Sequence, residues 1–173
     1  NFEIHNYLVN NLKGKIHISL GMTSEEEITS IINFYKENKK LNNLVLYACT
    51  SGYPVPAQDL CLLEIEKIMR LYGNDINAFG FSGHHNGIAP DIAALTIGQI
   101  QGKNIKAKFE FIERHFTLDR TWKGTDHAAS LEPEGLRKLC RDLKNTSRAI
   151  SYKKEDILDI EKPTRKKLKD FGK

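Results

Sequence analysis

The chain alternates between short apolar runs and longer segments in which apolar residues recur every three or four positions. Four runs rich in aliphatic and aromatic residues are predicted to be β-strands: residues 15–19, 44–48, 78–81 and 109–113. Each run is followed by the spacing of a helix that buries one face, and these predicted helices begin near residues 24, 59, 88 and 133. Phe2–Ile4 lies in a further predicted helix that is already under way, so we expect the natural protein to begin earlier.

Two of the predicted helices carry recognisable start signals. Ser24 and Glu27 have the spacing of a capping box, in which each residue bonds the backbone N–H of the other. Pro133 and Glu134 open the last predicted helix, where a proline and an acidic side chain are both favoured in the first turn. These signals support the alternation of strands and helices.

The order of the elements indicates an α/β fold. Equivalent points in the four predicted strands lie 28, 34 and 31 residues apart, which is the length of a βαβ unit. A doubly wound sheet and a (β/α)8 barrel of the TIM type both have this order. The chain has no glycine-rich phosphate motif, which disfavours the dinucleotide-binding form of the doubly wound sheet. Polar residues follow the strand ends, as in barrel enzymes, so we predict about half of such a barrel, with about four βα units.

Composition places the chain among ordinary globular domains. It has 173 residues, of which 40% are hydrophobic and 28% charged. No run of 18 or more apolar residues and no secretory signal is present, so a membrane location is not expected. Three cysteines without CxxC spacing indicate neither a disulfide framework nor a thiolate zinc site, and we expect a cytoplasmic protein.

The net charge of +4 is concentrated at the C-terminal end. Residues 162–173 contain six lysines and arginines against one acidic residue, a surplus larger than that of the whole chain. A nucleic-acid-binding protein needs its basic residues on a folded face, so we do not expect nucleic acid as a partner. The predicted organisation is an α/β domain over residues 1–150 and a basic linker or tail over residues 151–173.

Two histidines stand at the ends of neighbouring predicted strands. His84 follows the third strand and His115 the fourth, so two imidazoles could face one cavity and bind a divalent metal. Water and other oxygen ligands would complete the coordination of Mn²⁺ or a similar ion. The alternative is two hydrogen-bonded histidines at the edge of the core. His85 is expected to be merely exposed.

Hydroxyl groups follow three consecutive predicted strands, at Ser19, Ser51 and Ser82. Single hydroxyls usually stabilise turns, but together on one rim they could bind a phosphate through neutral donors. Tyr53 and Asp126 are candidates for binding sugar hydroxyls. Asp126 belongs to a long polar segment, residues 119–133, without helical or strand periodicity, and such segments are usually functional. The single tryptophan, Trp122, is expected to anchor this loop by packing.

Four motifs in order make the chain similar to the sialic acid synthase family. They are ISLGMTSEEEI, CTSGYPVPAQDL, FSGHHNGIA and ERHFTLDRTWKGTDHAASLEP. Their spacing matches the second half of that family's catalytic barrel, and the last motif resembles the N-acetylneuraminate enzymes more than the pseudaminic acid enzymes. The resemblance implies condensation of phosphoenolpyruvate with an N-acetylmannosamine-type sugar and release of phosphate.

The resemblance also implies roles for individual residues. His84 and His115 would ligate the divalent metal, usually Mn²⁺, with Mg²⁺ or Co²⁺ as alternatives. Phosphoenolpyruvate would be held by Ser19, Ser51 and Ser82, and the sugar by Tyr53 and Asp126. The family forms homodimers in which a C-terminal antifreeze-like domain reaches the partner's site; this domain, and the acid and lysines of the first four strands, are absent from the chain. The alternatives are a legionaminic or pseudaminic acid synthase, or a non-catalytic half barrel that binds a metal or a partner.

Overall fold

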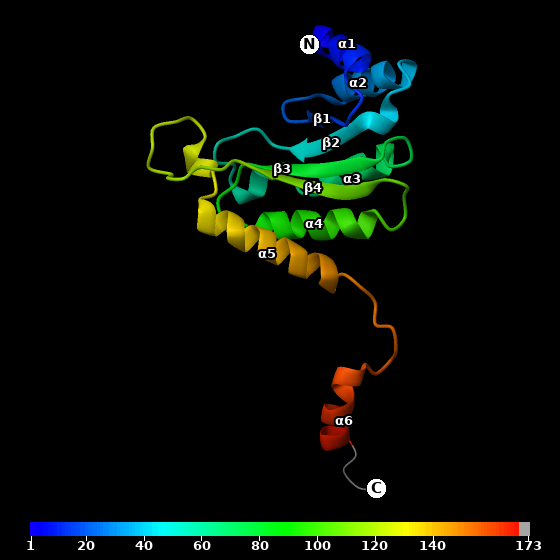
Figure 1. The fold of residues 1–173 in the computed structure, drawn as a ribbon, viewed down its shortest axis with the longest axis vertical. Coiled ribbons are helices and arrows are strands. Elements are labelled where there is room, and N and C mark those ends of the chain that lie inside the picture. Colours follow the sequence, from blue (N-terminus) through cyan, green and yellow to red (C-terminus); the bar gives the residue numbers. More distant parts are fainter. Residues whose placement is uncertain (170–173) are drawn as a thin grey trace.

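The computed structural model describes residues 1–169 and has the α/β architecture that the sequence predicts (Figure 1). Its elements are α1 (Phe2–Asn11), β1 (Ile16–Ser19), α2 (Glu25–Glu37), β2 (Leu44–Cys49), α3 (Glu64–Tyr72), β3 (Ala78–Gly83), α4 (Ala89–Gln101), β4 (Lys108–Arg114), α5 (Pro133–Ala149) and α6 (Lys162–Lys169). All four predicted strands are confirmed to within two residues at each end. The capping box of α2 is confirmed as well, since the Ser24 hydroxyl accepts from the Glu27 N–H and the Glu27 carboxylate accepts from the Ser24 N–H.

The four strands form one parallel sheet in the order β1-β2-β3-β4. Each crossover therefore leads to the next strand in the same direction. A doubly wound sheet reverses direction at a switch point, whereas a barrel continues around its axis. The order agrees with the predicted half barrel and not with a doubly wound sheet.

The two faces of the sheet are covered differently. On one face, alternate strand residues such as Leu46, Phe79 and Phe81 are buried against the helices in the main hydrophobic core. The helices contribute apolar side chains such as Ile65 and Met69 to the same core. The opposite face, which we call the open face, has a small separate cluster made of Val45, Tyr47, Ala78 and Phe111.

The open face is concave. Lys15, next to β1, pairs with Glu110 of β4 at 2.9 Å, although β1 and β4 are not neighbours in the sheet. The rings of His17 and Phe111 meet across the same face with centroids 5.0 Å apart. Such contacts between the two edge strands require a strongly curled sheet, as in a barrel wall.

A glycine makes room for the aromatic ring at the centre of this face. The Tyr47 ring lies over Gly80, where a Cβ atom would be 2.6 Å from Tyr47 Cε1. The Tyr47 hydroxyl is 2.8 Å from Nδ1 of His17, which fixes the ring in this position. A large and a small residue thus lie side by side on the open face, and His17 has a structural role there.

A β-bulge in β4 changes which side chains face the open side. Phe79 pairs with Phe109, but Gly80 pairs with Phe111, so Glu110 is an extra residue in β4. Phe109 therefore packs in the main core, whereas Phe111 belongs to the open-face cluster. The bulge also turns the residues that follow, including Glu113, toward the concave side.

One expectation about the helices is wrong. The third helix begins at Glu64 rather than near Asp59, because a 3-10 turn over Ala57–Asp59 is followed by Cys61 with a positive φ of 48°. The segment predicted as a linker or tail contains a short helix, α6, which stands apart from the sheet and its helices (Figure 1). The end of the predicted tail, residues 170–173, lies outside the described residues. Among the described helices, none has the length and apolar character needed to cross a membrane.

Candidate functional site

The two candidate histidines lie together at the carboxyl end of the sheet. His84 follows β3 and His115 follows β4, and their ring centroids are 5.0 Å apart with the planes at 76°. The His84 residue is 5% exposed, whereas the His115 side chain is 31% exposed. The adjacent parallel strands thus bring both imidazoles to one place, as the sequence analysis predicts.

Each of these imidazoles has an oxygen partner at its Nδ1 atom. Nδ1 of His84 lies 3.1 Å from the carbonyl oxygen of Thr50, and Nδ1 of His115 lies 3.5 Å from Oδ2 of Asp126. Histidines that bind metals typically hydrogen-bond a carbonyl or a carboxylate through the nitrogen that does not bind the metal. The arrangement leaves Nε2 of both rings for a ligand.

Tyr53 and Asp126 complete the cluster around the histidines. The Tyr53 ring is 4.5 Å from the His84 ring and 5.6 Å from the His115 ring, measured between centroids. Both added side chains are partly open to solvent, Tyr53 at 46% and Asp126 at 40%. We call His84, His115, Tyr53 and Asp126 the histidine cluster.

Ser82 has an acidic partner that the sequence analysis did not single out. Its hydroxyl donates to Oε1 of Glu113 at 2.7 Å, from β3 to β4. Burial raises the pKa of Tyr47, and the charge of Glu113 raises that pKa further. Glu113 therefore faces the concave side, where an acid can accept from substrate hydroxyls or bind a cation. The sequence gives only a weak signal for this role, an acidic residue two positions before His115 in a strand that also contains Lys108, Glu110 and Arg114.

Ser19 and Ser51 meet around Gly21. The Gly21 N–H donates to the Ser19 hydroxyl at 3.3 Å, and a Cβ atom on Gly21 would collide with the Ser51 hydroxyl. Cys49 also lies next to Gly21, and its Sγ is 3.8 Å from Nδ1 of His84. Cys49 therefore lies between the two serines and the histidine cluster. Ser82 contacts Glu113 rather than this pair, so the three serines do not form one hydrogen-bonded group.

The long loop after β4 is held by local polar contacts. Arg120 donates to Asn86 at 3.0 Å and to the carbonyl oxygen of Ala128, which ties the loop to the segment after β3. Hydrogen bonds from Thr121, first the hydroxyl and then the backbone N–H, lower the pKa of Asp119. Trp122 is 55% exposed, so the prediction that it anchors the loop is wrong; polar groups do so instead.

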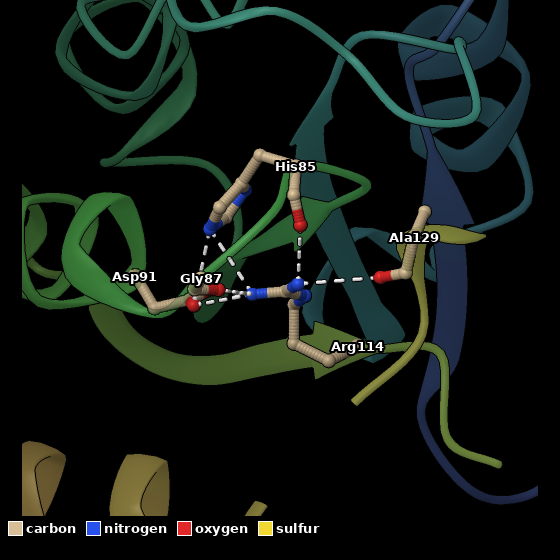
Figure 2. Close-up of polar contacts among 5 residues, drawn as sticks. All are labelled: His85, Gly87, Asp91, Arg114 and Ala129. Carbon is tan, nitrogen blue, oxygen red and sulfur yellow. Dashed lines mark hydrogen bonds and ion pairs between the residues drawn. The ribbon is translucent and has the colours of Figure 1, made fainter. Parts of the chain in front are cut away.

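The expectation that His85 is merely exposed is also wrong. The residue is 2% exposed, and its Nε2 lies 3.2 Å from Oδ2 of Asp91 and 3.0 Å from Nη1 of Arg114 (Figure 2). Strand alternation explains the error, because His84 takes the open face and its neighbour must then face the helices. We call His85, Asp91 and Arg114 the buried polar cluster.

Two further observations bear on the chemistry. A hollow of about 760 Å³ between α2 and α3 reaches Ser51, but neither His84 nor His115 lines it. Within residues 1–169, no group of three or more His, Cys, Asp or Glu side chains is arranged to hold a metal. A metal bound by the two imidazoles would therefore keep open positions for water or substrate oxygens.

Comparison with known proteins places the chain in a family. The family model described as NeuB family matches residues 2–155. N-acetylneuraminate-9-phosphate synthase of Homo sapiens is 38% identical over 152 residues, which are 87% of this chain and 38% of that protein. N,N'-diacetyllegionaminic acid synthase of Campylobacter jejuni is 34% identical over 140 residues, 80% of this chain and 38% of that protein.

Solved structures agree with the sequence relatives. The crystal structure of N-acetylneuraminic acid (sialic acid) synthetase from Leptospira borgpetersenii superposes with a TM-score of 0.68 at 27% identity. The match covers 90% of this chain and 50% of that one, which fits four of the eight units of a TIM-type barrel. The chain spans less than half the length of the curated relatives it matches. By its sequence and its fold, the chain belongs to the NeuB family.

Proposed function

We propose that the chain supplies one half of the active site of a sialic acid-type synthase. The enzyme would condense phosphoenolpyruvate with N-acetylmannosamine or a related amino sugar and release phosphate. The observation that carries the proposal is the histidine cluster, where two imidazoles, a phenol and a carboxylate meet at the strand ends. Barrel enzymes have their active sites at this end of the sheet.

The residues present fit a divalent metal. His84 and His115 would hold it through Nε2, since both Nδ1 atoms already face oxygen partners. We propose Mn²⁺, with Mg²⁺ or Co²⁺ as alternatives, because imidazole together with oxygen ligands suits such ions. When bound, the ion would supply a Lewis acid for the aldehyde oxygen of the open-chain sugar.

The chain's own side chains would hold the two substrates. Tyr53 and Asp126 are partly exposed beside the histidines, so sugar hydroxyls can reach them. Ser19 and Ser51 would offer neutral donors to the phosphate or carboxylate of phosphoenolpyruvate. Ser82 would join them only by exchanging its bond to Glu113 for one to the substrate.

The proposed reaction forms one carbon–carbon bond and replaces the bond between C2 and the phosphate oxygen by a bond to the oxygen of water. C3 of phosphoenolpyruvate attacks the aldehyde carbon, whose oxygen takes up a proton and becomes a hydroxyl. Water adds at C2, and phosphate leaves with cleavage of the bond between C2 and the bridging oxygen. Holding both substrates in one orientation supplies a large part of the rate enhancement.

The setting of the enzyme is part of the proposal. The three cysteines, Cys49, Cys61 and Cys140, are free thiols, which suits a reducing cytoplasm. A homodimer remains an expectation from the family resemblance. A non-catalytic half barrel remains the alternative for the 173-residue chain by itself, because it spans only part of its relatives.

The experiment measures phosphate release by a form of the protein with a complete barrel. Phosphoenolpyruvate and Mn²⁺ are supplied with N-acetylmannosamine, with its 6-phosphate or without sugar. We expect phosphate release only when one of the sugars and Mn²⁺ are both present. Release that does not depend on sugar, or no release with either sugar, would contradict the proposal.

A further inference from the structure

The buried polar cluster lies on the far side of the strands from the histidine cluster. The side chains of His85 and Arg114 are 2% exposed and that of Asp91 is fully buried, so none of them is accessible to a substrate. The His85 ring stacks on Phe81, a residue of the main core, with centroids 6.0 Å apart. The cluster thus belongs to the layer between sheet and helices.

The buried polar cluster is joined directly to the site through the chain. His85 follows His84, and Arg114 precedes His115, so each pair of neighbours has one residue on each side of the sheet. Any rotation of the backbone at Arg114 would move the His115 ring. The same holds for His85 and the His84 ring.

Arg114 also binds the loops that surround the site. Its Nη2 donates to the carbonyl oxygen of His85 at 2.6 Å and to that of Ala129 at 3.4 Å. Its Nη1 donates to the carbonyl oxygen of Gly87 at 2.9 Å and to Oδ2 of Asp91 at 2.6 Å. One guanidinium therefore connects the segment after β3, the first turn of α4 and the loop after β4 (Figure 2).

The Ala129 contact extends to Asp126 of the histidine cluster. The Ala129 N–H and the Ser130 hydroxyl both donate to the carbonyl oxygen of Asp126, at 3.1 and 2.8 Å. Farther along, the Leu131 N–H donates to the carbonyl oxygen of His115 at 2.8 Å. The segment that Arg114 holds is therefore the one that places Asp126 beside His115.

Stability alone does not account for the cluster. Nδ1 of His85, Oδ1 of Asp91 and Nε of Arg114 are buried and have no hydrogen-bond partner among the described residues. Unsatisfied buried polar atoms cost free energy, and a buried ion pair is often no more stabilising than apolar side chains of the same size. What the cluster does provide is a rigid planar fork of donors with fixed directions.

We propose that Arg114, held by Asp91 and His85, is a positioning residue that sets the orientation of His84, His115 and Asp126. Its catalytic consequence rests on the proposed function, but the positioning itself does not. Lysine cannot replace it, because a single ammonium group cannot reach backbone carbonyls on two segments and a carboxylate on a third in fixed directions.

The test compares Arg114→Lys with Arg137→Lys in a form of the protein with a complete barrel. Arg137 is an exposed arginine of α5 paired with Glu134, so it controls for the change of side chain. Mn²⁺ affinity is measured by electron paramagnetic resonance, and amide hydrogen exchange is followed at Leu131 and at Val55, whose N–H donates to the His84 carbonyl. Far-UV circular dichroism verifies that the variants are folded.

We expect Arg114→Lys to keep the sheet protected while the Leu131 and Val55 amides exchange faster. Mn²⁺ affinity should fall about tenfold, the lower end of the range for residues that orient metal-binding histidines. The Arg137→Lys control should match the wild type in both measurements. If Arg114→Lys does not fold, the charge-balanced double variant Asp91→Leu, Arg114→Met takes its place, with the same expectation.

Two results would overturn the proposal. One is wild-type exchange at both amides together with unchanged Mn²⁺ affinity. The other is a uniform rise in exchange over the whole sheet, which would give Arg114 a merely structural role. If the wild type binds no Mn²⁺, the metal part of the proposed function fails, and the two amides still decide whether Arg114 positions the loops.

Discussion

Gly80→Ala should destabilise the protein strongly although it adds only one methyl group. The new Cβ would lie 2.6 Å from Cε1 of Tyr47 and 2.8 Å from the carbonyl oxygen of Phe111. The carbonyl belongs to the backbone of β4 and cannot move aside, so the Tyr47 ring must shift and lose its hydroxyl contact with His17.

The expected cost can be worked from these contacts. Inserting a methyl group into a tightly packed place costs about 1–3 kcal/mol. Loss of the Tyr47–His17 hydrogen bond adds about 1 kcal/mol, so the free energy of unfolding should fall by about 2–4 kcal/mol. With a urea slope of about 2 kcal/mol per M, the unfolding midpoint should drop by about 1–2 M.

The assay is equilibrium urea unfolding of Gly80→Ala beside Gly14→Ala. A methyl group on Gly14 would meet no other atom within 4 Å, so that variant should stay within about 0.5 kcal/mol of the wild type. Equal midpoints for the two variants would refute the reasoning. They would show that the concave face is not packed as described.

Three further predictions concern the loop and the chain. In a form of the protein with a complete barrel, Asp126→Ala should raise the KM for the sugar far more than the KM for phosphoenolpyruvate. The reason is that a carboxylate accepts hydrogen bonds from hydroxyls and repels anions. A larger change in the KM for phosphoenolpyruvate would mean that the two subsites are assigned the wrong way round. The 173-residue chain alone should show no synthase turnover, because its sheet has two open edge strands and the chain spans 38% of the length of its human relative. Phosphate release at the rate of a complete synthase would contradict this prediction. The pKa of Asp119 in the folded protein is lower than its ordinary value of 3.8. Its hydrogen bonds to Thr121 are therefore complete at any pH above 3.8 and are lost as the pH falls through the lowered pKa. The fluorescence of Trp122, the only tryptophan, should therefore change below pH 3.8 and not between pH 5 and 7, and Asp119→Asn should abolish the acid transition.

The strands could be predicted because their apolar character does not depend on distant residues. Buried parallel strands are apolar along their whole length, so the runs at 44–48 and 78–81 mark β2 and β3 directly. The pairing of the two candidate histidines followed as well, since adjacent parallel strands bring their carboxyl ends together. These parts of the fold are determined by local pattern and chain order.

Features that depend on tertiary contacts could not be predicted. The bulge at Glu110 changes which side chains of β4 face the helices and which face the open side, and no pattern in the sequence indicates it. The sequence does not show which of the adjacent residues His84 and His85 faces the helices and which faces the open side of the sheet, because this depends on the register of β3. The partners of His85 lie six and 29 residues away, at Asp91 and Arg114.

The start of α3 and the exposure of Trp122 show the limits of local rules. Apolar spacing from Asp59 onward suits a helix, but the positive φ of Cys61 interrupts it before Glu64. An aromatic residue in a polar loop usually packs, yet here Arg120 and Thr121 hold the loop through hydrogen bonds and the indole stays exposed.

The central claim is that His84 and His115 together bind one divalent metal at the end of the sheet. The most direct measurement, in a form of the protein with a complete barrel, is the Mn²⁺ affinity of the wild type, of His84→Ala, of His115→Ala and of the double variant, by electron paramagnetic resonance. His5→Ala is the control, because the His5 ring contacts Tyr35 of α2, through its hydroxyl and its ring, and not the histidine cluster. We predict one bound ion in the wild type and the control, and a loss of affinity of at least about tenfold in each single variant. Wild-type affinity in the double variant would contradict the account.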